Sequence, residues 1–266
     1  MVHVAALFRH PVKGFTPEAV DNLVVQDDGR VAGDRVLAIR FADAAEPEER
    51  DGLDHWPKSR GLALMDFPSL ARLDLAYDHA ARRVTISAEG AVLVDAGIDD
   101  AGRRAIADAV TEFMRSTPDG RRLDRAGRLP LAVVGDGAGS RFQDRARGFV
   151  SLHGRGSVEA VDAAITGASV DDRRFRSNIV VDGLPAWDEL GWRGRVRIGD
   201  VAFSVEKPIG RCLATHADPD TGERDAPVLK TLTRVFGHDE PTLGILLLPV
   251  EEGGRIRVGD VVELLG

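Results

Sequence analysis

Apolar and polar residues alternate along much of the first 98 residues. The longest such run spans residues 70–96, "LARLDLAYDHAARRVTISAEGAVLVDA", with turn residues between its alternating segments. A period of two is typical of antiparallel strands with one buried and one solvated face. The pattern also predicts a strand ending at Pro11 and two strands around the Asp28-Gly29 turn. Residues 44–61 are acidic and interrupted by Gly and Pro, so we expect a surface loop there.

The period changes over residues 99–116, "DDAGRRAIADAVTEFMRS". Apolar residues there recur at the spacing of one helical face, which predicts an amphipathic helix. The breaker Pro118-Asp119-Gly120 follows it. We therefore place a domain boundary here, with a β-barrel-like domain over residues 1–118 and a second domain over residues 119–266.

The second half mixes predicted strands with short helices. A helix is expected over residues 157–167, with Ser157 as its N-cap, and another over residues 226–237. The expected strands occupy residues 129–136, 177–183, 195–207, 242–250 and 255–265. Regular strand–helix–strand alternation is absent, so the sequence predicts an α+β fold, mostly antiparallel and barrel-like, with a few helices.

Composition and charge narrow the range of functions. The 266-residue chain carries a net charge of −8, which argues against non-specific nucleic-acid binding. No apolar run approaches the roughly 18 residues of a membrane span, so we expect no membrane partner. The first 15 residues lack the pattern of a signal peptide, and one cysteine cannot form an internal disulfide. These features predict a cytoplasmic protein.

The single cysteine, Cys212, has two interpretations. Most free cysteines are small buried hydrophobes, whereas some supply a thiolate for catalysis or metal binding. Arg211 precedes Cys212, and a neighbouring cation favours the thiolate form. A zinc site would need further ligands, and His216 alone does not supply them.

Several separated segments resemble the MOSC family, named for the molybdenum cofactor sulfurase C-terminal domain. Residues 211–232, "RCLATHADPDTGERDAPVLKTL", resemble its R-C, T-x-D-P-x-T-G and P-L-x-T-L signature. "FRHPVKGF" and "VAGDRVLAI" resemble its N-terminal β-barrel, and "GFVSLHGRGSVEAV" and "RFRSNIVVDG" resemble later segments in the same order. Gly14 and Ser177 depart from the pattern, because many relatives have Ser and Pro at these positions.

The resemblance implies a molybdopterin-type molybdenum cofactor. It assigns Cys212 as the thiolate ligand of molybdenum and as the catalytic residue. It assigns cofactor binding to Lys13, Arg35, Ser151, His153, Ser157, Arg176, Asn178 and Arg211. Each also has a simpler interpretation: Arg35 could pair with Asp34, Arg176 belongs to a charge run, and His153 could be a packed core histidine.

The resemblance further implies an oxidoreductase similar to the mitochondrial amidoxime-reducing component. Such an enzyme reduces N-oxygenated compounds, namely N-hydroxylamines and amidoximes, with electrons from a separate reductase. No flavin, haem or iron–sulfur motif is present, so the electron donor would be external. The alternative is a sulfur-carrier or cofactor-handling protein that holds a persulfide on Cys212.

Overall fold

The computed structural model describes residues 1–50 and 52–265, and its largest element is an eight-stranded sheet. Neighbouring strands within this sheet are antiparallel, except β11 and β12, which are parallel. In spatial order the strands are β17 (Val262–Leu265), β13 (Arg195–Ile198), β14 (Val201–Gly210), β15 (Thr242–Pro249), β11 (Val150–Gly154), β12 (Ile179–Asp182), β1 (His3–Arg9) and β2 (Glu18–Ala19). This sheet encloses a core of mostly aliphatic side chains, contributed by residues from Val4 to Val262.

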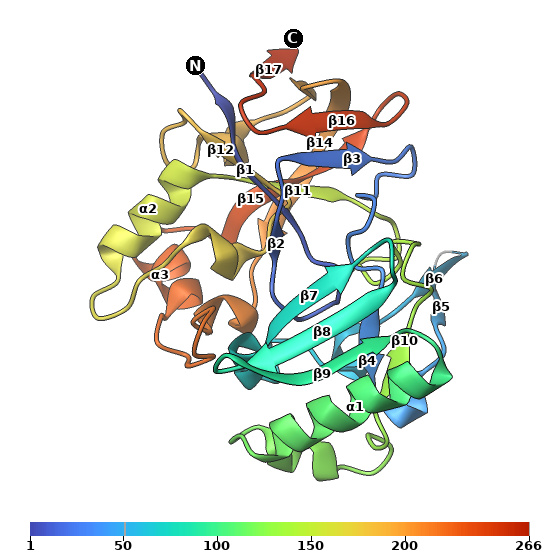
Figure 1. The fold of residues 1–266 in the computed structure, drawn as a ribbon. Helices are drawn as coiled ribbons and strands as arrows, with labels where there is room; N and C mark the ends of the chain where they lie inside the picture. The colour runs from blue at the N-terminus through green and yellow to red at the C-terminus, as the bar shows by residue number, and fades with distance from the viewer. Residues whose placement is uncertain (51, 266) are drawn as a thin grey trace.

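A three-stranded antiparallel sheet and the longest helix form a second core (Figure 1). Asp99 caps this helix by accepting a hydrogen bond from the Gly102 amide, and its apolar face packs against the sheet, as the sequence predicts. The elements are β7 (Asp74–Asp78), β8 (Arg83–Ala88), β9 (Ala91–Gly97) and α1 (Asp100–Arg115).

Smaller strand pairs and two helices complete the described residues. The pairs are β4 (Ala38–Arg40) with β10 (Ala132–Val134), β3 (Asn22–Val25) with β16 (Gly254–Arg257), and β5 (Glu48–Arg50) with β6 (Leu53–His55). The helices α2 (Arg155–Ala164) and α3 (Val228–Arg234) pack together through a third apolar cluster. The α+β, mostly antiparallel fold class predicted from the sequence is confirmed.

Six local predictions are wrong. Residues 44–61 contain the β5–β6 hairpin, and Trp56 is buried against Phe142 with ring centroids 4.9 Å apart. The strand expected after the Asp28-Gly29 turn is a single bridge between Val25 and Val31, and β4 begins only at Ala38.

The other four errors lie in the second half of the chain. The strand expected over residues 195–207 is two strands, β13 and β14, and the strand expected over residues 255–265 is β16 and β17. The expected end at residue 207 is also wrong, because register shifts let β14 continue through Pro208 to Gly210. Ser157 is not an N-cap, because α2 begins two residues earlier with Gly154 in the cap position.

Pairing between strands crosses the predicted boundary at residue 118. Strands β1, β2 and β3 belong to sheets of the C-terminal half, whereas β10 pairs with β4. The division into residues 1–118 and 119–266 stays a prediction, and Gly266 lies outside the described residues.

Among the described residues, no helix has the length and apolarity needed to span a membrane.

Candidate functional site

A cavity of about 610 Å³ is lined by residues from both halves of the chain. Its wall includes the segments that follow β1 and β14 and the segment that precedes β12, so residues far apart in the sequence meet there. Seven of the nine predicted site residues line it: Lys13, Arg35, Ser151, Arg176, Asn178, Arg211 and Cys212. His153 and Ser157 are absent from the wall.

The cavity concentrates positive charge in a chain whose net charge is −8. Ten lysine and arginine side chains line it, and within residues 1–50 and 52–265 the only carboxylate on the wall is Asp144. Such a concentration of one sign of charge in a concave site attracts anions.

Cys212 lies on this wall, just beyond the end of β14. Its backbone is extended, with φ −129° and ψ 177°, and a 3-10 turn over Leu213–His216 follows. Thr215 donates from its backbone N and its Oγ1 to the Cys212 carbonyl, each at 3.0 Å. The strand and the turn together fix the position of the thiol, which is partly exposed.

The Arg211 side chain, next to Cys212 in the chain, is partly buried. Its Nη1 donates to the Phe175 carbonyl at 2.7 Å, and its Nε donates to the Leu243 carbonyl at 2.7 Å. Burial lowers the pKa of Arg211 to about 10, while Cys212 acts in the opposite direction. Its hydrogen bonds run to carbonyl groups rather than carboxylates, so its positive charge is not neutralised by an ion pair.

Arg35 and Arg176 form a second cationic cluster around a buried histidine. Both have left-handed backbones, with φ 51° and 52°, and such strain in non-glycine residues gathers at functional sites. Arg35 pairs with Asp34, whereas Arg176 donates to the Phe15 carbonyl at 2.7 Å. Burial and the nearby Arg35 lower the pKa of Arg176 to about 10.

His10 lies at the base of this cluster and is fully buried. Burial and then Arg176 lower its pKa from 6.5 to about 3, so its ring is neutral near pH 7. Burial alone would raise the pKa of Asp34, but Arg35 and His10 outweigh it and hold that pKa below its ordinary value. The cluster therefore carries two cations and one carboxylate.

Lys13 is buried and holds the loop that contains Asp144. Its Nζ lies 2.9 Å from Asp144 Oδ1 and donates to the Gln143 carbonyl at 3.3 Å. Burial lowers the pKa of Lys13, while Asp144 opposes that shift. The Asp144 side chain is 61% exposed, so this pair lies at the edge of the cavity.

Ser151 and Asn178 bond mainly to each other. Ser151 Oγ donates to Asn178 Oδ1 at 2.9 Å and accepts from the Asn178 amide at 3.0 Å. These bonds join the start of β11 to the segment before β12 and shape the wall.

His153 and Ser157 lie behind the wall. His153 is fully buried and its Nε2 lies 2.9 Å from Asp172 Oδ1. Ser157 Oγ lies 2.9 Å from both carboxylate oxygens of the buried Glu189, and it accepts from the Trp187 amide. Ser157 Oγ therefore has protein partners, whereas His153 is paired only through Nε2 and its buried Nδ1 has no hydrogen-bond partner among the described residues.

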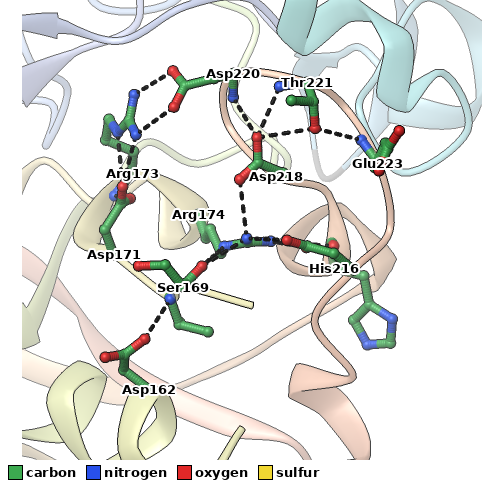
Figure 2. A network of polar contacts seen from close by, with 12 residues as sticks. Asp162, Ser169, Asp171, Arg173, Arg174, His216, Asp218, Asp220, Thr221 and Glu223 are labelled. Atoms are coloured by element: carbon green, nitrogen blue, oxygen red, sulfur yellow. Dashed lines mark hydrogen bonds and ion pairs between the residues drawn. The ribbon is translucent and has the colours of Figure 1, made fainter. Parts of the chain in front are cut away.

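Arg174, which we did not predict, anchors the loop that follows Cys212 (Figure 2). Its guanidinium has no exposed surface and forms a two-bond pair with Asp225, at 2.9 and 3.1 Å. It also contacts Asp218 Oδ2 at 3.3 Å and the His216 carbonyl at 3.2 Å.

Asp218 in turn organises the turn of the T-x-D-P-x-T-G segment. Its Oδ1 accepts from the amides of Asp220 and Thr221. The run "DDRRFR" gave no local signal that Arg174 is buried, because such a run usually covers a solvated face.

The family-model comparison bears on the second half of the chain. Residues 141–263 match the family model described as the MOSC domain. The chain is 35% identical over 113 residues to a protein of Anopheles gambiae named molybdenum cofactor sulfurase, covering 42% of this chain and 12% of that protein. A protein of the same name from Drosophila persimilis is 40% identical over 94 residues, which are 34% of this chain and 12% of that protein. The chain thus matches only a small part of these relatives.

Two solved structures are similar at low identity. The YUAD protein from Bacillus subtilis is 12% identical with a TM-score of 0.44, covering 98% of this chain and 94% of that one. YiiM from Escherichia coli is 18% identical with a TM-score of 0.34, covering 46% and 55%. The family assignment rests instead on the match over residues 141–263, which include Cys212 and strands β11 to β15. These residues of the chain are therefore a MOSC domain.

Proposed function

We propose that the chain is a molybdenum-cofactor-dependent oxidoreductase. It reduces N-oxygenated compounds, such as N-hydroxylamines and amidoximes, with electrons from a separate reductase. The observation that carries the proposal is the cationic cavity with Cys212 on its wall. An anionic cofactor requires such a cradle even in an acidic protein.

The residues present fit a molybdopterin-type group. Gln143 lines the cavity, and its buried Oε1 has no hydrogen-bond partner among the described residues. Arg176 and Arg211 are partly buried cations with carbonyl partners, which leaves positive charge for an anion. The described residues contain no group of three or more His, Cys, Asp or Glu side chains that could hold a bare metal ion. A metal at Cys212 would therefore need further ligands from a cofactor.

Each residue has a distinct part in this proposal. Cys212 Sγ would bind the metal, and Arg211 would hold positive charge beside it. Lys13, Arg35 and Arg176 would bind the cofactor phosphate. Ser151 and Asn178 would shape the wall, while His153 and Ser157 would support it from behind. When bound, the cofactor would supply two-electron redox chemistry that the side chains cannot.

The test is the molybdenum content of protein from a host that makes the cofactor. Parent protein and a Cys212→Ala variant are compared by inductively coupled plasma mass spectrometry. Leu213→Ala is the matched control, because Leu213 is the next residue, is 41% exposed and does not line the cavity. We expect stoichiometric molybdenum in the parent and the control, and a sharp loss in the variant. No molybdenum in any of them, with the cofactor present in the host, refutes the proposal.

The names of the relatives favour a second candidate, a sulfur carrier. In this case the Cys212 thiolate attacks the outer sulfur of a donor persulfide, takes up that sulfur as its own persulfide and releases the donor as a thiolate. Mass spectrometry separates the candidates, since one added sulfur on Cys212 without molybdenum supports the carrier.

A further inference from the structure

Three exposed cations of the cavity wall are not needed for the proposed cofactor cradle. They are Arg145, Arg147 and Lys207, here called the rim cations. In the part of the chain that the structure describes, their side chains form no ion pair or hydrogen bond. The rim therefore presents uncompensated positive charge to a ligand in the cavity.

The backbone of the loop that carries Arg145 and Arg147 is held by two hydrogen bonds from other parts of the chain. The Gln143 carbonyl accepts from Lys13 at 3.3 Å, and the Ala146 carbonyl accepts from Arg30 at 3.1 Å. The two accepting residues, Gln143 and Ala146, lie on either side of Arg145, and Ala146 immediately precedes Arg147. A fixed loop that carries two arginines loses less entropy on binding an anion than a mobile one.

Lys207 faces the same cavity from β14. It precedes Cys212 by five residues, so at a strand rise of about 3.3 Å the two Cα atoms lie at most roughly 16 Å apart. A molecule with its reacting group near Cys212 can therefore reach Lys207 with its other end. The cavity of about 610 Å³ is concave and has the size of a small-molecule site, which favours a small ligand over a protein partner.

We infer that the rim cations bind an anionic group on the substrate. The preferred substrates are N-oxygenated compounds that carry a carboxylate or phosphate away from the N–O bond. This inference rests on the proposed function, because it assigns the inner part of the cavity to the cofactor.

The experiment compares two probes that differ in one charge, benzamidoxime and 4-carboxybenzamidoxime. The 266-residue chain from a cofactor-making host is used, with its molybdenum content measured first and reduced methyl viologen supplied as the electron donor. The rim variant combines Arg145→Gln, Arg147→Gln and Lys207→Gln. The control variant combines Arg104→Gln, Arg115→Gln and Arg121→Gln, which remove the same charge from exposed positions on and after α1. Calorimetric titration with benzamide and 4-carbamoylbenzoate, which are not reduced, measures binding apart from turnover.

We expect the parent and the control to favour the anionic probe by about tenfold in kcat/KM and in binding. Interaction of its one carboxylate with three exposed rim cations would give a preference of this size. The preference should shrink as salt shortens the Debye length from about 30 Å to about 10 Å. In the rim variant it should fall to near unity, with molybdenum unchanged.

Three results overturn the inference while leaving the proposed function intact. One is equal kcat/KM for both probes in the parent. Another is loss of molybdenum from the rim variant, which would place these cations in the cofactor cradle. The third is that the rim variant reduces both probes equally slowly, while its binding of benzamide and 4-carbamoylbenzoate matches that of the parent. That result would indicate that the rim cations serve electron delivery rather than substrate binding. Absence of molybdenum from the parent refutes the proposed function itself, and with it this inference.

Discussion

Removal of the Arg174 guanidinium tests whether a buried ion pair contributes more to the stability of the fold than an exposed one. In Arg174→Met the side chain keeps most of its apolar volume but loses every bond to Asp218, Asp225 and the carbonyls of Ser169 and His216. Two carboxylates then face each other without a cation. Breaking a fully buried pair costs about 3–5 kcal/mol.

The expected loss of stability lies at the lower end of this range because the two carboxylates are partly solvated. The side chains of Asp218 and Asp225 are 23% and 28% exposed, whereas that of Arg174 is fully buried. We therefore expect a loss of about 3 kcal/mol in the free energy of unfolding. For a chain of this size that corresponds to a fall in Tm of about 6–10 °C.

The neighbouring Arg173 provides the matched control (Figure 2). It also pairs with two carboxylates, Asp171 and Asp220, but its side chain is 39% exposed. An exposed network of this kind contributes less than about 1 kcal/mol, so Arg173→Met should lower Tm by at most a few degrees. Thermal unfolding followed by circular dichroism measures both variants. Equal losses for the two arginines would refute the argument that burial decides the effect.

Three further predictions follow from buried or strained groups. The pKa of His10 is lowered to about 3, so its neutral ring contributes stability above pH 6.5 that is lost as pH falls toward 3. Between pH 6 and 4, His10→Gln should reduce the slope of unfolding free energy against pH by about 1.4 kcal/mol per pH unit. Urea unfolding at several pH values measures this slope, and an unchanged slope would contradict the prediction. Gly14 has φ +89°, and a Cβ there would lie 3.0 Å from the Leu62 carbonyl, whereas Gly90 has φ +79° and open space. Gly14→Ser should therefore destabilise the fold by about 1 kcal/mol more than Gly90→Ser in urea unfolding, and a gain in stability would be inconsistent with the crowding. Ser157→Ala should lower the free energy of unfolding by about 1–3 kcal/mol, because it removes buried bonds to Glu189, yet it should leave the molybdenum content unchanged. Ser151→Ala should lower the molybdenum content. Loss of molybdenum from Ser157→Ala but not from Ser151→Ala would place the cofactor on the other side of the wall.

Local patterns predicted the elements with one buried face. The β7–β9 sheet and α1 are amphipathic, so their periodicity carries the information about which side is buried. The β5–β6 hairpin was missed because five of its six residues are exposed and mostly charged, which gives no alternation. Pro208 was misleading because the register shifts that accommodate it depend on the partner strand β15, which is distant in the sequence.

The site was predictable only where a motif marked it. Cys212 and Lys13 were identified by resemblance, and their meeting in one cavity depends on sheet pairing between distant segments. Asp144, which pairs with Lys13, and Arg174 belong to stretches without a periodic signal. Their roles follow from long-range contacts that a single sequence does not encode locally.

The charge of the cavity gives a physical reason why it should bind an anion. The fold keeps His10 neutral, places Arg35 and Arg176 close enough to lower the pKa of Arg176, and holds both arginines in left-handed conformations. The two left-handed conformations and the proximity of two cations cost folding free energy, and the carboxylate of Asp34 compensates only part of the charge. An anion bound between the two arginines would relieve their repulsion in the folded state alone, so binding there would stabilise the fold. Under the proposed function, this pair of arginines is therefore where the cofactor phosphate would bind.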